Sequence, residues 1–354
     1  IFRAMVMFDM VRLWGDFPVI TTVADDITSE NIDEVYPQYF PKQNTELEAY
    51  QQIEKDLLDA VLYAPDNTPG NKTLFSKSVA RTLLAKIYAE KPLRDYTKVI
   101  QYCDEVKADG FDLVDDFSDL FGMNAAGTDA KMRNTKESIL EAQFTSGAGN
   151  WCTWMFGRDL VNWNNNFTWA KWVTPSRDLI SAFKQEGDEV RFKESIVYYD
   201  CNWSNYYPSD NYPFMYKCRS ANSSIIKYRY ADVLLLKAEA LIMQDTPDLE
   251  GAADIIDEVR DRAKLGALPT SVRSNKNVLL NALLKERRLE LAFEGQRWFD
   301  LVRLDKVEEV MNAVYAKDSG RKAQIYTFDK NSYRLPIPQS VIDANDKIHQ
   351  NPGY

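Results

Sequence analysis

The first half of the chain repeats apolar residues at the three-four spacing of amphipathic helices. Three such stretches lie at residues 46–63, 76–89 and 96–108. This spacing places the apolar side chains on one face of a helix. Pro65, Pro92 and Gly110 follow the stretches and end them, because neither residue type continues a helix easily. We therefore predict three consecutive helices here. In the first stretch the apolar positions are Leu47, Tyr50, Ile53, Leu57, Leu58 and Val61.

A second helical region follows later in the chain. Its periodic stretches cover residues 228–243, 249–263, 278–293 and 298–314. Alanines recur at interior positions in both regions, and small side chains let neighbouring helices approach closely, as in tetratricopeptide-type arrays. The sequence therefore predicts an all-α, mainly helical fold of stacked helical hairpins with irregular loop insertions.

A weak internal repeat joins the two regions. Residues 8–13 read Phe-Asp-Met-Val-Arg-Leu, and residues 299–304 read Phe-Asp-Leu-Val-Arg-Leu. Because five of the six positions are identical, we expect both segments to close helical hairpins in the same way.

The segment between the helical regions differs in composition. Between residues 151 and 216, 17 of 66 residues are aromatic, whereas the aromatic share of the whole chain is 12%. Six of the eight tryptophans lie there, together with many asparagines and three prolines. This composition favours loops and short irregular elements over a regular helix.

Tryptophans and asparagines in loops are a combination that suits carbohydrate binding. The wide face of an indole attracts the C–H face of a sugar ring, and amide groups hydrogen-bond with hydroxyls. The alternative is that these rings fill a small core beneath long loops, and some of them must, because not all can face one ligand. The candidate ligand-binding residues are Trp151, Trp154, Trp163, Asn164, Asn165, Trp169, Trp203 and Tyr206.

Composition excludes several classes of function. The 354 residues carry a net charge of −10, so a nucleic acid is an unsuitable partner. One histidine, His349, cannot form a zinc site that needs two or more imidazoles. We find no glycine-rich nucleotide loop and no G-x-S-x-G elbow, and the apolar runs are too short to span a bilayer. We expect no cofactor.

Carboxylates offer two further candidate sites. Glu286, Glu290 and Glu294 share one helical face, so they could supply the pair of acids that glycoside hydrolysis needs. The arginines around them favour the alternative, an ion-pair network that locks helices together and explains the pattern without a ligand. The aspartates near residue 116 lack the spacing of a calcium loop, and we expect no metal site.

Four segments resemble the SusD/RagB family, the surface nutrient-binding lipoproteins of Bacteroidetes. They cover residues 8–18, 80–88, 228–240 and 286–303, and the last contains Phe293-Glu294-Gly295-Gln296-Arg297-Trp298. The ending around Leu335-Pro336-Ile337-Pro338 is similar to the family's C-terminus as well. Residues 124–223 resemble nothing recognisable. The resemblance implies one SusD-like domain over residues 1–354, N-terminally incomplete, with 124–223 as a variable aromatic-rich insertion that forms the ligand face.

The resemblance also implies a function. Family members sit on the extracellular face of the outer membrane through a lipid anchor, which we expect to be absent from this fragment, and deliver glycans to a SusC-like TonB-dependent transporter. We therefore expect non-catalytic binding of oligosaccharides or polysaccharides for nutrient uptake. Two alternatives remain open at this point: the cargo is a peptide, or the chain is an all-helical glycoside hydrolase.

Overall fold

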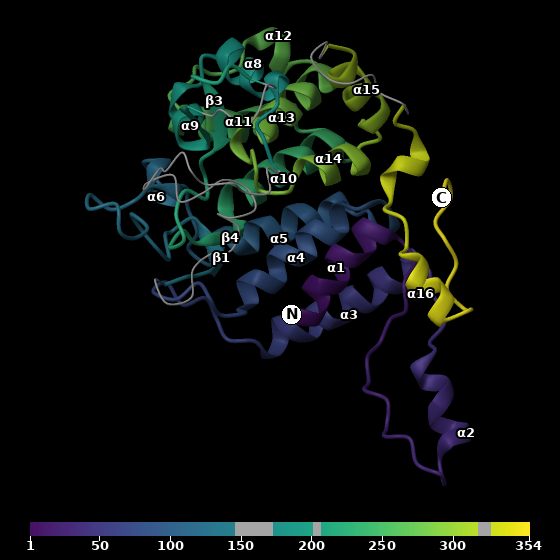
Figure 1. The fold of residues 1–354 in the computed structure, drawn as a ribbon. Helices are drawn as coiled ribbons and strands as arrows, with labels where there is room; N and C mark the ends of the chain where they lie inside the picture. The colour runs from purple at the N-terminus through teal and green to yellow at the C-terminus, as the bar shows by residue number, and fades with distance from the viewer. Residues whose placement is uncertain (146–172, 201–206, 318–326) are drawn as a thin grey trace.

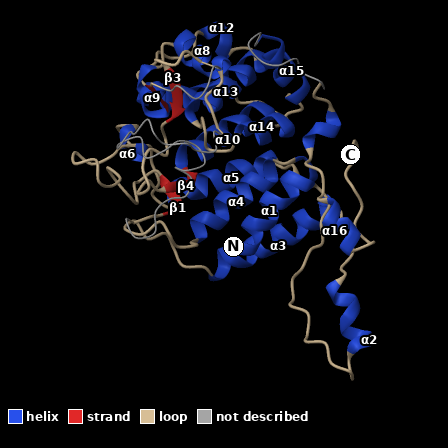
Figure 2. Cartoon of the chain, in the orientation of Figure 1, coloured by secondary structure: helices blue, strands red, loops and turns tan. Residues whose placement is uncertain are grey.

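Helices make up most of the molecule, and the strands are few and short (Figure 2). The computed structural model describes residues 1–145, 173–200, 207–317 and 327–354. The predicted mainly helical class is thus confirmed.

The N-terminal helices form one layered stack (Figure 1). They are α1 (Phe2–Trp14), α3 (Glu46–Tyr63), α4 (Lys77–Ala89) and α5 (Tyr96–Ala108). Helix α1 packs on α3, α3 packs on α4, and α4 packs on α5. Helix α3 starts at a capping box, in which Thr45 Oγ1 accepts from the backbone of Glu48 while the Glu48 carboxylate accepts from the Thr45 backbone.

The later helices continue this stack. They are α10 (Tyr230–Met243), α11 (Leu249–Arg262), α12 (Thr270–Arg273), α13 (Lys276–Glu290), α14 (Arg297–Arg303) and α15 (Val307–Lys317). Helix α10 packs against α5 on one side and against α11 and α13 on the other. One hydrophobic core therefore runs from α1 through α5 and α10 to α13. Alanines in it, such as Ala80, Ala85 and Ala238, are fully buried, which explains the close approach of the helices.

The remaining helical elements are short and lie outside the main helical stack. An arm projects from the body and carries α2 (Ile32–Val35) and the 3-10 helix η1 (Tyr36–Tyr39) (Figure 1). The others are η2 (Lys91–Leu93), α6 (Ser118–Phe121), α8 (Arg177–Glu186), α9 (Glu189–Ser195), η3 (Lys330–Tyr333) and α16 (Gln339–Ala344). Among the described residues, no helix has both the length and the apolar content to cross a membrane.

Two antiparallel strand pairs were not predicted from the sequence. Strand β1 (Ser138–Ala142) pairs with β4 (Ile225–Arg229), and β2 (Ile196–Tyr199) pairs with β3 (Tyr212–Met215). The helix predicted from residue 228 therefore begins at Tyr230, because the two preceding residues are held in β4.

The helix predicted for residues 298–314 is two helices in the structure. Helix α14 ends at Arg303, and Asp305 takes a left-handed backbone conformation with φ of 55° before α15 begins. The repeated segments in α1 and α14 do form the same local contact. Arg12 pairs with Asp9 at 2.6 Å, and Arg303 pairs with Asp300 at 2.9 Å.

The C-terminal segment returns to the first helix and completes its C-terminal end. The Leu335 backbone N–H donates to Leu13 O at 2.7 Å, and Asn351 Nδ2 donates to Trp14 O at 2.9 Å. Arg334 Nη1 donates to Arg12 O at 3.2 Å. These carbonyls have no partner within α1, so the far end of the chain satisfies them.

Candidate functional site

Helix α8 is the element that builds the candidate site. It begins at Ser176, whose Oγ accepts from the Leu179 backbone, and it ends at Gly187 in the left-handed conformation. Leu179, Ile180 and Phe183 form its buried face and pack against Ile196, Leu289 and Ala292. The helix therefore rests on β2 and on the C-terminal part of α13.

A cavity of about 430 Å³ lies beside α8, and we call it the α8 cavity. Helix α8, the end of β2 and the turn before β3 contribute its walls. Arg177, Ser181 and Lys184 stand at positions i, i+4 and i+7 of the helix, which places them on one face. The lining residues are Arg177, Ile180, Ser181, Lys184, Gln185, Tyr198, Tyr207, Pro208 and Asn211.

Two tyrosines give this cavity its aromatic surface. The Tyr207 hydroxyl donates to Pro175 O at 2.7 Å, and its ring meets Tyr212 edge-on at a centroid distance of 5.6 Å. The Arg177 guanidinium carbon lies 5.1 Å from the Tyr207 ring centroid, within cation-π range. Burial raises the pKa of Tyr198, so its hydroxyl stays protonated at neutral pH. The hydrogen bond and ring contacts of Tyr207 hold its ring in place without a ligand.

Ion pairs connect α8 to helices α11 and α13. Asp178 accepts from Arg288 at 2.6 Å, and Glu186 accepts from Arg260 at 2.6 Å and from Lys285. Burial acts to raise the pKa of Glu186, but Lys285 and Arg260 outweigh it and hold this pKa below its usual range. Both acidic side chains of the helix are thus committed to α11 and α13.

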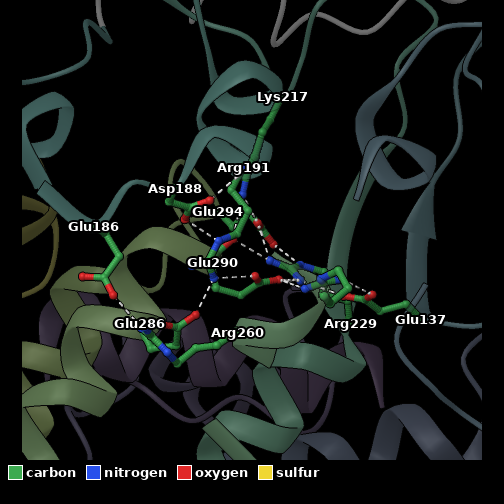
Figure 3. Close-up of polar contacts among 11 residues, drawn as sticks. Glu137, Glu186, Asp188, Arg191, Lys217, Arg229, Arg260, Glu286, Glu290 and Glu294 are labelled. Atoms are coloured by element: carbon green, nitrogen blue, oxygen red, sulfur yellow. Dashed lines mark hydrogen bonds and ion pairs between the residues drawn. The ribbon is translucent and has the colours of Figure 1, made fainter. Parts of the chain in front are cut away.

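A buried ion-pair network connects α9, β4, α11 and α13 (Figure 3). Glu290 lies at its centre and accepts from Arg191 at 3.0 Å, from Arg229 at 2.5 Å and from Arg262. Burial acts to raise the pKa of Glu290, but the three guanidinium groups prevail and hold it well below its usual range. Glu286 accepts from Arg191 at 2.5 Å.

The network decides between the two interpretations of the acidic run in α13. Glu286 and Glu290 are buried, both are paired with arginines, and neither is among the described residues that line the α8 cavity. The ion-pair interpretation is therefore confirmed. The partners of the two glutamates come from α9, β4 and α11, which lie far away in the sequence, whereas the adjacent Arg287 and Arg288 pair with aspartates instead.

A second cavity, of about 410 Å³, lies where the repeated segments of α1 and α14 approach β4. It is lined by Arg12, Phe299 and the loop of Phe293, Glu294 and Gly295. Every cationic group on its wall has a carboxylate partner: Arg12 and Lys227 pair with Asp9, and Lys217 pairs with Glu294. Burial lowers the pKa of Lys217 to about 8. Within the described residues, this cavity is thus a part of the scaffold whose charges are already paired.

All eight residues predicted to bind a ligand lie outside the described residues. All nine described lining residues of the α8 cavity fall in the aromatic segment, residues 151–216, and the predicted Trp203 and Tyr206 lie between Tyr198 and Tyr207 in the chain. Sequence reasoning missed Arg177 and Lys184. The signal for them was their i, i+7 spacing in a short amphipathic helix. Among the described residues, no cluster of three or more His, Cys, Asp or Glu could hold a metal ion.

Comparison with known proteins identifies the family. The SusD family matches residues 210–354, and a SusD-like family described as starch-binding and associating with the outer membrane matches residues 1–89. This chain belongs to the SusD/RagB family. The resemblance that the sequence motifs indicated is therefore confirmed.

Relatives of this SusD/RagB chain are found in Formosa agariphila and Bacteroides ovatus. SusD-like protein P2 of Formosa agariphila is 28% identical over 99% of this chain and 72% of its own length. A SusD-like protein of Bacteroides ovatus is 26% identical over 85% of this chain and 57% of its own length.

Solved structures show the same fold. A SusD superfamily protein from Parabacteroides distasonis matches 99% of this chain and 77% of its own, with a TM-score of 0.76 and 23% identity. A laminarin-binding SusD-like protein matches 99% of this chain and 77% of its own, with a TM-score of 0.71 and 24% identity. At this identity the agreement establishes the architecture of the SusD/RagB chain.

Proposed function

We propose that this SusD/RagB chain captures oligosaccharides at the outer membrane and passes them to a SusC-like TonB-dependent transporter. Proteins of this family are non-catalytic, which agrees with the buried, paired state of Glu286 and Glu290. The α8 cavity is the observation that carries the proposal. It combines two tyrosine rings with the hydroxyl and amide groups of Ser181, Gln185 and Asn211, which is the chemistry that a sugar ring and its hydroxyls require.

Relatives support the choice of a glycan over a peptide as the cargo. One structural neighbour is described as laminarin-binding, and the family that matches residues 1–89 is described as starch-binding and associating with the outer membrane. That description also supports the outer-membrane location, and the extracellular face follows from the role in nutrient capture. The eight predicted residues between Trp151 and Tyr206 remain proposed ligand contacts beside the cavity.

Calorimetric titration with a panel of plant, algal and host glycans tests this function. We expect saturable binding of at least one glycan, with dissociation constants in the micromolar to millimolar range (~10⁻⁶ to 10⁻³ M), because shallow sugar sites only slightly exceed the cost of immobilising the ligand. Binding of a peptide library without any glycan would overturn the proposal. Release of reducing sugar would overturn its non-catalytic part.

Variants locate the site. Tyr198→Ala and Tyr207→Ala should each weaken glycan binding by about three- to ten-fold, the loss of one aromatic contact. Tyr63→Ala is the matched control, because Tyr63 is 84% exposed at the end of α3, away from the α8 cavity. Urea unfolding of each variant separates a lost contact from a lost fold. Trp203→Ala, read by the change in tryptophan fluorescence during titration, tests the neighbouring aromatic segment.

A further inference from the structure

The arm that carries α2 and η1, residues 18–41, exposes an unusual share of apolar side chains. Among the described residues, a third of the large apolar side chains that are exposed belong to this short segment, and Val23 is the most exposed of all at 94%. Such a concentration is typical of a surface that binds another protein. The six exposed apolar residues of the arm are Ile20, Val23, Ile27, Ile32, Tyr36 and Tyr39.

The arm is ordered by its own contacts and does not pack on the body (Figure 1). The Thr28 backbone N–H donates to Asn31 Oδ1 at 2.7 Å, and the Tyr39 hydroxyl donates to Asp25 O at 3.0 Å. Within the described chain, residues 22–39 form hydrogen bonds only inside the arm. No described part of the protein therefore covers the six apolar side chains.

The base of the arm is fixed to the rest of the molecule. The Asn44 backbone N–H donates to Phe17 O at 3.1 Å, and Asn345 Nδ2 donates to Pro41 O at 2.8 Å. The arm and helix α8 lie at opposite ends of the molecule as Figure 1 shows it. A partner bound to the arm is therefore held in a defined place and leaves the α8 cavity open.

The arm is also strongly acidic. Residues 18–41 contain five acids and no Lys, Arg or His, so this segment carries half of the chain's net charge of −10. All five acids are exposed, and none forms an ion pair within the described chain. They alternate with the apolar residues: Asp25 and Asp26 precede Ile27, and Asp33 follows Ile32.

This charge decides which kind of partner fits. A surface that covers the apolar residues must also bring cations to the acids between them, because complementary charge favours association and like charge opposes it. An anionic lipid surface is repelled, and a second copy of this chain brings the same negative charge. The matching surface combines apolar pockets with lysines or arginines.

We propose that the arm is the segment through which this chain docks on its transporter, and that the transporter presents a basic, apolar surface to it. The exposed apolar side chains enter the pockets of that surface, and the five carboxylates pair with its cations. This inference rests on the proposed function and assigns the contact with the transporter to the arm.

Cross-linking in intact cells tests the contact. Photo-reactive p-benzoylphenylalanine replaces Val23 in one protein and Leu62, which is 68% exposed on α3, in another. We expect the group at Val23 to attach to a SusC-like transporter, identified by mass spectrometry, and the group at Leu62 not to do so. Attachment from Val23 only to a second copy of this chain, or equal attachment of the transporter from both positions, would overturn the proposal.

Variants of the arm separate the apolar from the charged contribution. Val23→Ser combined with Ile27→Ser should weaken binding of the purified transporter in detergent by about ten-fold or more, because two apolar contacts are lost. Asp25→Asn combined with Asp26→Asn and Glu30→Gln should weaken it by about three- to ten-fold at about 0.05 M salt. This second difference should largely vanish at about 0.5 M salt, where exposed charges are screened.

A matched control removes the same kinds of side chain elsewhere. Leu62→Ser combined with Asp59→Asn changes one exposed apolar residue and one exposed acid of α3, and it should leave the affinity for the transporter unchanged. Urea unfolding and glycan titration of the arm variants should match the wild type, because their substituted side chains neither belong to the core nor line the α8 cavity.

The outcomes separate this inference from the proposed function. If the arm variants keep full affinity for a transporter that the wild type binds, docking through the arm is wrong while glycan capture and transfer stand. If the control variant loses as much affinity as the arm variants, the assignment to the arm is overturned. If the arm variants lose glycan affinity but not transporter affinity, the arm is a glycan contact, and the docking proposal fails.

Discussion

Glu290 shows how one residue can hold distant parts of this fold together. Its single carboxylate contacts arginines from α9, β4 and α11. Because all of these groups are buried, each relies on the others to offset the loss of hydration. Removal of one member should therefore cost far more than a surface ion pair contributes.

Replacement of this carboxylate tests that reasoning. Glu290→Gln keeps the shape of the side chain but leaves the three guanidinium groups without their shared counter-charge. We expect the free energy of unfolding to fall by about 3–5 kcal/mol, measured by urea denaturation. Glu309→Gln is the control, because Glu309 is 66% exposed in its pair with Lys306, and its loss should stay below about 1 kcal/mol. Equal losses in the two variants would contradict a central role for Glu290.

At the residue scale, the sequence could not reveal the charge of the candidate site. Arg177 and Lys184 look like the ordinary polar face of a short helix, and so do Asp178 and Glu186. Only the tertiary structure shows that both acids pair with α11 and α13, while Arg177 and Lys184 line the cavity. The aromatic composition drew attention to residues 151–216, where the lining residues of the α8 cavity also lie, because a local excess of one residue type can be seen without knowledge of the fold.

At the scale of elements, helix α8 depends on the glycine that ends it. Gly187 has φ of 69° and ψ of 24°, the left-handed conformation that residues with a Cβ adopt only at a cost. A Cβ added there would meet no other atom within 4 Å, so the cost is conformational alone.

Two glycine substitutions separate conformation from packing. Gly187→Ala should lower the free energy of unfolding by about 1 kcal/mol through the left-handed backbone. Gly70→Ala should be neutral or slightly stabilising, because Gly70 also has open space around it and does not have a positive φ. Both are read from urea unfolding curves. A similar loss at both positions would show that backbone conformation does not explain the need for Gly187.

Helices were the predictable elements of this fold. The predicted bounds of α3 and α5 agree with the structure, because a sustained apolar period and clear terminating residues specify a helix locally. The strand pairs were not predictable in this way. Strand β1 pairs with β4 across about ninety residues of chain, and each strand is only five residues long, too short for a periodic pattern to stand out. The break between α14 and α15 at Asp305 was not predicted, because no glycine or proline marks it in the sequence.

At the scale of the whole molecule, ion pairs connect successive layers of the stack. Asp232 in α10 accepts from Lys86 in α4 at 2.6 Å and from Arg287 in α13 at 2.7 Å. Burial acts to raise the pKa of Asp232, but Lys86 and Arg287 outweigh it and hold this pKa below the ordinary value of 3.8. The folded state therefore binds this proton less readily than the unfolded chain does.

Stability should consequently decline in acid. A carboxyl group with a lowered folded-state pKa contributes its full stabilisation above the ordinary value of 3.8 and loses it as the pH falls further. We expect the free energy of unfolding of the wild type to drop as the pH falls from about 4 to about 2. Asp232→Asn should start lower and drop less over the same interval. Parallel curves for the two proteins, measured by urea denaturation at each pH, would show that Asp232 does not contribute to acid sensitivity.

Because the C-terminal segment returns to α1, this helix can be completed only after the end of the chain has been synthesised. The Arg334 contact that helps to complete the first helix spans 322 positions of the chain. At a ribosomal speed of about 5–20 residues per second, α1 waits roughly 16–64 s for the residues that satisfy its last carbonyls. During that interval the last carbonyls of α1 lack the donors that the C-terminal segment supplies. Ribosome-associated chaperones would therefore encounter the helix with these carbonyls unsatisfied.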